Sequence, residues 1–526
     1  MISDTSKLPD DPAELKKIIG KMSDTQRRYE SENDLLREQV RHLYDKLYGR
    51  KSENSQGHNP QLPLFDMPEP DPDEKEEETT EVSSHSRKKR GRKPLPDSLP
   101  RIEVVHDLSD EEKICGCGTE LSRIGEEVSE KLDIIPAIIQ VIRHIRPKYS
   151  CKSCEGVEDT RSAVKIAPVP PQIIPKSLAS GGLLAHILTA KFTDALPFYR
   201  QEKQFSRLGT EIGRATMCNW AMKVAEKCTP LLGLIENRIR SGPLINIDET
   251  TLQVLHEPGR SPTTKSFMWV FRGETSHGTG LVYQYHQTRS GNAAAAFLRG
   301  YCGAVQSDGY KGYDFLDKKK DIVHLGCWAH ARRKFHEADR ARGKKAKKTG
   351  SVTVALKYIK NIYRIEKELN LKNLSVQERV KWRKEKTQPI LDDFEKWLQK
   401  KSVQVAPKSL FGKAVAYTLR QWHRLTKFVN VGEATPDNNL AENAIRPFVI
   451  GRKNWLFAGT PEGARASATI YSLIETSKAN NLEPYKYLRF LFEHLPLADS
   501  VEDYEKLLPF NLTVEQLELP VAWSVV

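Results

Sequence analysis

Two aspartates in apolar surroundings are the first candidates for chemistry in this sequence. Asp248 lies in the segment INIDET, and Asp308 ends the segment VQSD, where Gly309 permits a sharp turn that exposes the carboxylate. A carboxylate buried among apolar residues requires a partner or a metal ion. Glu249 should point to the opposite face of its strand from Asp248, so only one of the two can be a ligand, and Asp248 is the candidate. Strand aspartates are more often edge or turn residues, so this pair matters only if the fold brings both carboxylates together.

A third carboxylate is expected on a helix further along the chain. Polar residues from Thr435 precede a helical pattern in which Glu442 and Arg446 lie four residues apart and share a face. An ordinary surface ion pair is the alternative. The residues beside Glu442 are apolar, which favours a helix packed against a sheet, from which its carboxylate could reach the same site.

Three carboxylates are a sufficient ligand set for Mg²⁺ in phosphodiester chemistry. Two Mg²⁺ ions about 4 Å apart stabilise both the attacking and the leaving oxygen of an in-line displacement. Mg²⁺ prefers hard oxygen ligands and keeps several waters, and Mn²⁺ accepts similar ligands. Arg446, Arg452 and Lys453 lie close to the third acid and are candidates for contacts with nucleic-acid phosphates, with surface salt bridges as the alternative.

The order of the predicted elements brings the two aspartates together. Three β-rich runs occupy 244–255, 266–274 and 280–288. They are followed by a helix at 292–301, a strand at 303–308, a helix at 311–320, a strand at 322–327 and a helix from 328. This βββαβαβα order is the RNase H arrangement, a mixed sheet with helices packed on its faces. The first and fourth strands are neighbours in that arrangement, so Asp248 and Asp308 should meet at one end of the sheet.

The predicted fold class is therefore α/β multidomain, with an RNase H-like mixed-sheet catalytic core at 236–460. A basic helical stretch from 331 to about 430 is predicted as an insertion into this core, and 461–526 as a C-terminal helical region. Residues 161–235 contain three short helical patterns with a Gly-containing turn, which fits either a helix-turn-helix DNA-binding region or an ordinary helical connector.

The N-terminal residues carry a heptad pattern. Apolar residues recur every seven positions from Leu15 to Leu43, and a second stripe four places later contains Gln26 and Asn33, which would weaken the seam while fixing its register. Residues 1–50 are therefore predicted as a coiled coil that joins two or more copies of the chain. A solitary amphipathic helix packed on its own protein is the alternative.

Residues 51–100 are predicted as a disordered linker, because a Pro-rich acidic tract gives way abruptly to a basic run. Arg90 and Arg92 flank Gly91 in that run and form an extended basic arm. Such an arm can lie in a narrow minor groove, where negative potential is concentrated. Two alternatives are equally open: the arm attracts DNA phosphates without entering a groove, or it does not bind DNA.

Two tight cysteine pairs define a small module at 101–160. Cys115, Cys117, Cys151 and Cys154 can place four thiolates around a structural Zn²⁺, and strand-like residues at 138–150 lie between the two pairs, as in a zinc-ribbon-like module. Four unligated thiols, or a site that has lost its metal, are the alternatives. His144, between the pairs, is interpreted as a surface residue among arginines.

Composition limits the function classes. The 526 residues carry 82 Lys and Arg against 69 Asp and Glu, a formal charge of +13, which favours a polyanionic partner or simple solubility. No run approaches the ~18 apolar residues of a membrane span, and the polar, acidic start is unlike a signal peptide. We therefore expect a cytoplasmic protein with no membrane partner.

Several long motifs resemble one bacterial family. INIDET, QSDGYKGY, GCWAHARRKF, DNNLAENAIRPFVIGRKNWLFAGTPEGARASATIYSLIET, the paired cysteines with VIRHIRPKYSC and the N-terminal LYGRKSE together resemble the sixty-six-type insertion-sequence transposases, a DDE family. The resemblance covers nearly the whole chain. It implies that Asp248, Asp308 and Glu442 correspond to the DDE triad, and that the cysteine module is the family's DNA-binding unit, although one cysteine pair is spaced more tightly than usual. Cys327 and His330 resemble a Cys-x-x-His signature of such enzymes, and we expect them to be structural and not ligands.

The resemblance implies a metal-dependent DNA transposase that binds the ends of an insertion sequence in double-stranded DNA. Hydrolysis would free a 3′-hydroxyl at each end, and transesterification would join it to target DNA. We expect a homodimer or higher oligomer, association with the bacterial nucleoid when DNA is bound, and small accessory proteins encoded by the same element. The alternatives are an RNase H-like nuclease without joining activity and a catalytically inactive DNA-binding regulator.

Overall fold

The structure, a computed structural model, describes residues 11–48, 139–150, 164–341 and 350–518. The chain divides into one unit of Met1–Glu69 with Lys148–Val526 and a second of Pro70–Pro147. The predicted zinc ligands Cys115, Cys117, Cys151 and Cys154, and the arm residues Arg90 and Arg92, lie outside the described residues. The zinc module, the linker and the basic arm therefore stay predictions.

The strand predicted at 138–150 is wrong for most of its length. Residues 139–147 are irregular, and only Lys148–Ser150 (β1) is a strand, paired antiparallel with Val164–Ile166 (β2). Apolar and basic residues alternate here, but an extended segment becomes a strand only where a partner accepts its backbone hydrogen bonds. β2 is three residues long, so it offers that partnership to three residues only.

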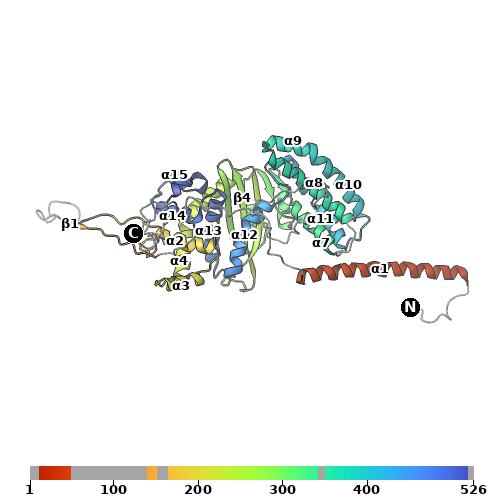
Figure 1. Cartoon of the computed structure of the whole chain (residues 1–526), viewed down its shortest axis with the longest axis horizontal. Helices are drawn as coiled ribbons and strands as arrows, with labels where there is room; N and C mark the ends of the chain where they lie inside the picture. Colours follow the sequence, from red (N-terminus) through yellow and green to blue (C-terminus); the bar gives the residue numbers. More distant parts are fainter. Residues whose placement is uncertain (1–10, 49–138, 151–163, 342–349, 519–526) are drawn as a thin grey trace, which may run out of the picture. The chain divides into compact units, whose positions relative to one another are not determined.

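A five-stranded mixed sheet lies at the centre of the larger unit (Figure 1), in the order β5-β4-β3-β6-β7. Its strands are β3 (Leu244–Gln253), β4 (Lys265–Thr275), β5 (Gly278–His286), β6 (Gly303–Gln306) and β7 (Ile322–Leu325). The first three are antiparallel to one another, and β6 and β7 continue parallel to β3. The sequence therefore predicted all five strands and the neighbouring positions of the first and fourth. The short helix α6 (Asn292–Phe297) precedes β6, and the predicted helix at 311–320 is a 3₁₀ helix, η2 (Lys311–Lys318).

The three helices predicted before the sheet are present as α2 (Gly181–Phe192), α3 (Phe198–Arg207) and α4 (Arg214–Lys227). A further helix, α5 (Thr229–Arg240), was not predicted. Gly273 of β4 lies opposite Gly280 of β5, and a side chain on either glycine would meet Ile239 of α5 within 2.9 Å. The paired glycines therefore let α5 pack closely on the sheet.

The free edge of β5 is covered by α13 (Pro461–Ala479). Thr476 Oγ1 accepts from the backbone N–H of Leu281 at 3.0 Å, and Ser472 Oγ accepts from that of Tyr283 at 2.8 Å. The two hydroxyls are four residues apart on a helix, which is a rise of about 6 Å, and the two N–H groups are two residues apart on a strand, which is a rise of about 6.6 Å. The spacing of the hydroxyls therefore matches that of the N–H groups. Side chains of α13 thus replace the next strand of the sheet and protect its edge.

The predicted insertion is helical, as expected. It comprises α7 (Trp328–Ala341), α8 (Ser351–Leu371), α9 (Val376–Lys386), α10 (Gln388–Ser402), α11 (Leu410–Leu425) and η3 (Lys427–Asn430). These helices bury a core of their own around Trp328 and Phe394. Within it Arg383, fully buried, donates to both carboxylate oxygens of Glu366 at 2.8 and 2.7 Å. The burial of this ion pair shows that the insertion is a packed helical layer.

The remaining described elements are helical. α12 (Asn439–Trp455) follows the insertion, and α14 (Pro484–His494), η4 (Leu495–Leu497), α15 (Val501–Lys506), η5 (Pro509–Asn511) and η6 (Glu515–Leu517) follow α13. The heptad residues belong to one long helix, α1 (Pro12–Tyr48). None of the helices in the described ranges is long and apolar enough to cross a membrane.

Candidate active site

The parallel register of β3 and β6 gives Asp248 and Asp308 equivalent positions. Asn246 pairs with Gln306 across these strands, and each aspartate lies two residues beyond its member of the pair. Asp248 lies within β3, and Asp308 lies just beyond the end of β6 at Gln306. The two carboxylates therefore leave the same end of the sheet from adjacent strands, as predicted from the strand order.

Three buried amide side chains tie this end of the sheet to α12. The Nδ2 of Asn246 donates to Gln306 Oε1 at 3.0 Å and to Asn438 Oδ1 at 3.1 Å. Asn438, which immediately precedes α12, donates in turn to the carbonyl of Ile247 at 2.8 Å. These bonds hold the first turn of α12 against β3 and β6, so the position of this helix depends on the same strands that carry the aspartates.

Glu442 lies one turn into α12, four residues after Asn438, and is buried with 5% of its surface exposed. Its carboxylate lies against the imidazole of His330, with Glu442 Oε1 3.6 Å from His330 Nδ1. The surface pair with Arg446 considered from the sequence is therefore not what holds this carboxylate. A buried carboxylate on a helix packed against β3 fits the predicted third acid.

The three acids interact electrostatically. Burial raises the pKa of Asp248 well above its ordinary value, and the charges of Glu249, Glu442 and Asp308 raise it further. Burial likewise raises the pKa of Glu442 to about 7; the charge of Arg333 opposes this rise, and those of Asp437 and Asp308 add to it. Carboxylates that oppose one another's ionisation are a fitting binding place for a divalent cation, because a cation removes the repulsion and the oxygens are hard ligands. The donor set therefore fits Mg²⁺.

Glu249 already has a partner. Its Oε1 lies 2.5 Å from Arg289 Nε, and Tyr313 also donates to its carboxylate. Arg289 reaches Asp308 as well, with its Nη2 3.8 Å from Asp308 Oδ2, and its guanidinium lies 3.8 Å from the centroid of the Tyr310 ring. Arg289 therefore lies between a buried glutamate and one of the three acids, and sequence reasoning missed it.

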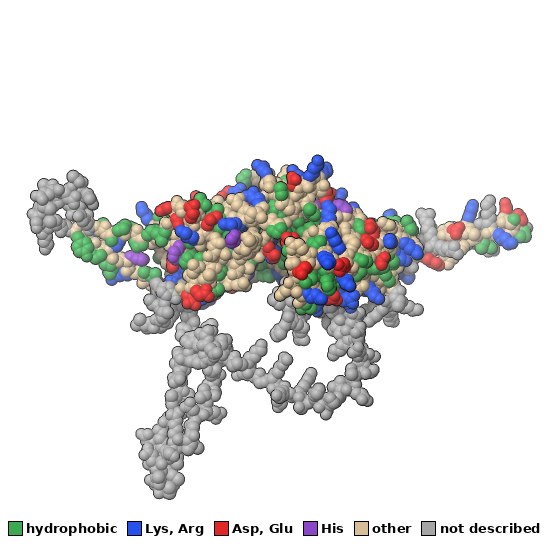
Figure 2. All heavy atoms as spheres, turned by 90° about the horizontal axis from the view of Figure 1, so that it is seen from above, with side chains coloured by type: hydrophobic (Ala, Val, Ile, Leu, Met, Phe, Trp, Pro, Cys, Tyr) green, Lys and Arg blue, Asp and Glu red, His purple; other side chains and the backbone are tan. Residues whose placement is uncertain are grey.

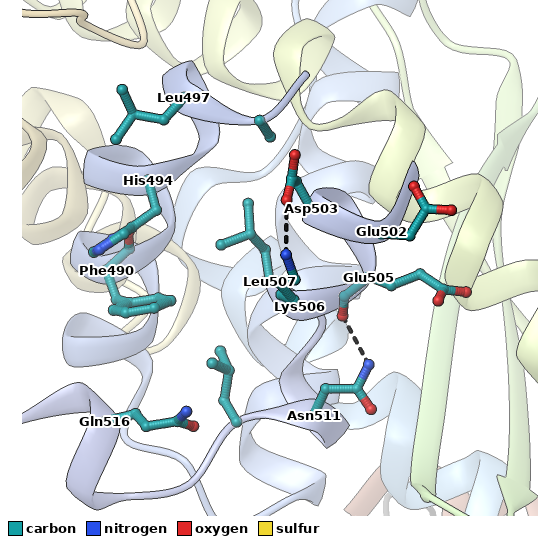
Figure 3. Close-up of a pocket in the computed structure, with 12 residues that line it drawn as sticks. Phe490, His494, Leu497, Glu502, Asp503, Glu505, Lys506, Leu507, Asn511 and Gln516 are labelled. Atoms are coloured by element: carbon teal, nitrogen blue, oxygen red, sulfur yellow. Dashed lines mark hydrogen bonds and ion pairs between the residues drawn. The ribbon is translucent and has the colours of Figure 1, made fainter. Parts of the chain in front are cut away.

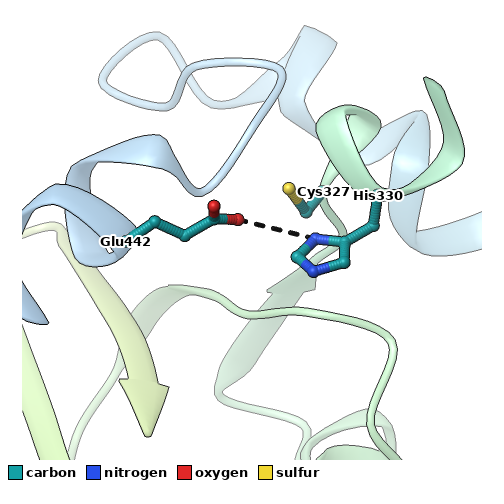
Figure 4. Close-up of side chains that lie close together, drawn as sticks. All are labelled: Cys327, His330 and Glu442. Carbon is teal, nitrogen blue, oxygen red and sulfur yellow. Dashed lines mark ion pairs between the residues drawn. The ribbon is translucent and has the colours of Figure 1, made fainter. Parts of the chain in front are cut away.

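Cys327 and His330 lie beside Glu442 (Figure 4). Donor atoms of these three side chains all lie within 4.8 Å of one another. Burial raises the pKa of the Cys327 thiol well above its ordinary value, with further contributions from Glu442 and Asp437. Burial also lowers the pKa of His330 to about 4, so its imidazole is neutral at pH 7. The sequence marked both residues as structural, and the structure places them directly against the third acid.

The predicted phosphate contacts lie further along the same helix. Arg452 Nη1 donates to the hydroxyls of Thr250 at 3.1 Å and Thr251 at 3.2 Å, just beyond Asp248 on β3. Arg446 is half-buried and Lys453 is exposed. In Figure 2 the Lys and Arg side chains lie among acidic and apolar ones on the face shown. The three basic residues therefore follow Glu442 on one helix, and Arg452 is anchored to the strand of Asp248.

A hollow of about 660 Å³ lies in the C-terminal region, between α14 and the segment from α15 to η6 (Figure 3). Phe490 and His494 line it from α14, and Lys506, which bonds Asp503 at 2.9 Å, lines it from α15. None of the residues predicted to do chemistry lines this hollow. The candidate chemistry therefore belongs to the end of the sheet.

The sequence contains a pattern from which the three buried amide residues could have been predicted. Asn246 and Gln306 are polar residues inside apolar strands, and each stands two positions before an aspartate. Asn438 stands one helical turn before Glu442. A buried polar residue on the same face as a candidate ligand indicates a supporting hydrogen bond.

Comparison with known proteins identifies the class of protein as a transposase. The family model described as "Transposase IS66 family" matches residues 176–466, which include the sheet, the insertion and all three acids. Models for the zinc-finger binding domain of transposase IS66 and for the IS66 C-terminal element match residues 112–155 and 472–510. A fourth, described as "Transposase C of IS166 homeodomain", matches residues 35–104.

Relatives from Sinorhizobium fredii (strain NBRC 101917 / NGR234) match most of the chain. The uncharacterized protein y4jD is 30% identical over 506 residues, which cover 92% of this chain and 95% of the relative. The uncharacterized protein y4qI is 32% identical over 452 residues, covering 82% and 81%. The chain therefore belongs to the IS66 transposase family, a family of enzymes that cut and join DNA.

Proposed function

We propose that Asp248, Asp308 and Glu442 are the catalytic acids of this transposase and hold two Mg²⁺ ions for phosphodiester hydrolysis and transesterification. The observation that carries the proposal is the convergence of these carboxylates: two at equivalent positions of adjacent parallel strands, and one on a helix bonded to the same strands. We further propose that the sheet with its helices is an RNase H-like catalytic core. The strand order and directions support this assignment.

The bound ions would supply charge stabilisation to the attacking and leaving oxygens. The remaining work falls to residues of the chain. Asn246, Gln306 and Asn438 hold the carboxylate-bearing elements in register, and the apolar face of α12 keeps Glu442 buried. Arg446, Arg452 and Lys453 would bind phosphates next to Glu442, because guanidinium and ammonium groups donate charge-assisted hydrogen bonds to phosphate oxygens. The DNA strand would thus cross the sheet end along α12.

The test removes one carboxylate at a time. We expect Asp248→Asn, Asp308→Asn and Glu442→Gln each to lower Mg²⁺-dependent cleavage of an element-end DNA by at least about 1,000-fold, because each removes a ligand charge while keeping the side chain's shape. Cleavage is measured on labelled duplexes. Asp321→Asn is a matched control, since Asp321 is exposed and precedes β7 at the opposite end of the sheet. Undiminished cleavage by any triad variant would remove that residue from the proposal.

The same substrate separates joining from cutting alone. A labelled element end with a free 3′-hydroxyl should appear covalently linked to a target plasmid. Cleaved ends without joined products would favour the nuclease alternative.

A further inference from the structure

Cys327, His330 and Glu442 bring three kinds of donor atom together. The thiol, the imidazole and the carboxylate come from the start of α7 and from α12, and Figure 4 shows the side chains converging. Their donor atoms lie within 4.8 Å of one another, and His330 Nδ1 is 3.6 Å from Glu442 Oε1. Donors of one small ion must converge in this way.

The cluster is buried and incompletely bonded. Cys327 has 2% and Glu442 5% of its surface exposed. Glu442 Oε1 and His330 Nδ1 are both buried, and within the described ranges neither atom has a hydrogen-bond partner. Buried polar atoms are nearly always satisfied, so two adjacent unsatisfied atoms indicate a ligand between them.

Burial keeps the free Cys327 thiol protonated, but two local groups would stabilise a thiolate that is bound to a metal ion. The backbone N–H of Asn438 points at the sulfur, 3.3 Å away, and Cys327 immediately precedes the first residue of α7. Backbone N–H groups and the positive end of a helix dipole both stabilise a thiolate. The geometry therefore supplies what a metal-bound sulfur needs.

We propose that Cys327, His330 and Glu442 form a binding site for a zinc-class cation, separate from the predicted zinc module of the cysteine pairs. A thiolate, an imidazole and a carboxylate together select Zn²⁺ over Mg²⁺, which takes oxygen ligands. Binding displaces the thiol proton to solvent, so one ion enters and one proton leaves. Three protein ligands leave one tetrahedral position open to water.

The site has a regulatory consequence, which rests on the proposed function. Glu442 is the third acid of the proposed Mg²⁺ site, so an ion held by Cys327 and His330 engages a carboxylate that catalysis requires. Zn²⁺ in excess should therefore inhibit Mg²⁺-dependent cleavage, and a chelator selective for Zn²⁺ should restore it.

Co²⁺ is the probe for the site itself, because thiolate-bound Co²⁺ absorbs by charge transfer from sulfur. The full chain, stripped of metal, is titrated with Co²⁺ alongside Cys327→Ala, His330→Gln and the control Cys218→Ala, which removes an exposed cysteine of α4. We expect the wild type and Cys218→Ala to bind one Co²⁺ more per chain than Cys327→Ala or His330→Gln. The other cysteines contribute equally to every sample and cancel in the difference spectra.

Equal stoichiometry and identical spectra in all four proteins would overturn the site. His330 keeps 21% of its side chain exposed, so His330→Gln gives a reading even if Cys327→Ala folds poorly, which circular dichroism detects. The two proposals fail separately. If Cys327→Ala and His330→Gln each lose one Co²⁺ while Glu442→Gln keeps full cleavage activity, the metal site stands and Glu442 has no catalytic role.

Discussion

At the scale of single residues, Arg289 is the least expected feature of the site. It bonds Glu249, whose side chain is 1% exposed, and it approaches Asp308 to 3.8 Å. Burial and the charge of Asp308 raise the pKa of Glu249, while Tyr313 and Arg289 oppose that rise. Arg289 thus holds a buried charge in place and supports the carboxylate of Asp308 from the side.

We expect Arg289→Met to lower the free energy of unfolding by about 1–3 kcal/mol, because it leaves the Glu249 carboxylate buried without its cation. Urea denaturation measures this. If Arg289 positions Asp308, the Mg²⁺ concentration for half-maximal cleavage should also rise about tenfold, as is common for residues that support a metal ligand. Arg465→Met, which breaks an exposed pair with Glu462, is the control. A variant that loses stability but keeps the Mg²⁺ dependence would reduce Arg289 to a structural residue.

At the scale of elements, a chain of polar contacts links the insertion to the strand that precedes Asp308. Ser307 Oγ lies 2.9 Å from His324 Nε2 on β7, and His324 Nδ1 lies 3.0 Å from Asp317 Oδ1 on η2. Arg424 of α11 binds the other oxygen of Asp317. Ser307 and His324 are fully buried, so this Ser-His-Asp arrangement has no access for a substrate. It joins β7, η2 and α11 to the segment that leads to Asp308.

This link predicts a dependence of stability on pH. Burial, and then the charge of Arg424, lowers the pKa of His324 to about 4 from an ordinary 6.5. The unfolded chain therefore binds the proton more readily between these values, and stability falls as pH drops from about 6.5 to about 4. At about 1.4 kcal/mol per pH unit, His324 accounts for at most about 3.5 kcal/mol.

Urea denaturation between pH 7 and pH 4 tests this expectation. His324→Asn should be less stable at pH 7, yet its unfolding free energy should fall less steeply with acidification than that of the wild type. Parallel curves for the two proteins would contradict the assignment of the proton to His324.

At the scale of the whole molecule, α1 carries apolar side chains that its own chain leaves exposed. Ile19, Met22, Tyr29, Leu36, Val40 and Leu43 expose between 53% and 64% of their surfaces. These are the heptad positions predicted from the sequence, and exposed apolar stripes of this kind mark association surfaces. We propose that they pair with α1 of a second copy, which would hold two catalytic units on two element ends.

We expect Leu36→Asp with Leu43→Asp to convert the full chain from dimer or higher oligomer to monomer in analytical ultracentrifugation, because each charge would be buried in the seam. Removal of residues 1–50 should do the same. Arg37→Asp, which changes an exposed charge on the same helix, should leave the assembly intact. A chain without residues 1–50 that remains fully dimeric would place the interface elsewhere.

The sequence by itself predicted most of the helices, the five strands of the central sheet and the adjacency of its first and fourth strands. Those features follow from local periodicity, which backbone hydrogen bonding imposes over a few residues, and from the topology that this order favours. α5 was missed although it is a regular helix, and the strand expected at 138–150 was mostly absent because pairing depends on a partner and not on pattern alone.

Only the tertiary structure decided which distant side chains meet. Glu442 was assigned by resemblance, since a long insertion separates it from Asp308, and its contact with His330 spans that insertion. The position of Arg289 between Glu249 and Asp308 was likewise invisible in the linear pattern, and which groups the buried amides bond was decided by the packing of α12 on β3 and β6. Contacts between residues far apart in sequence depend on how whole helices and strands pack, and no local periodicity encodes that packing.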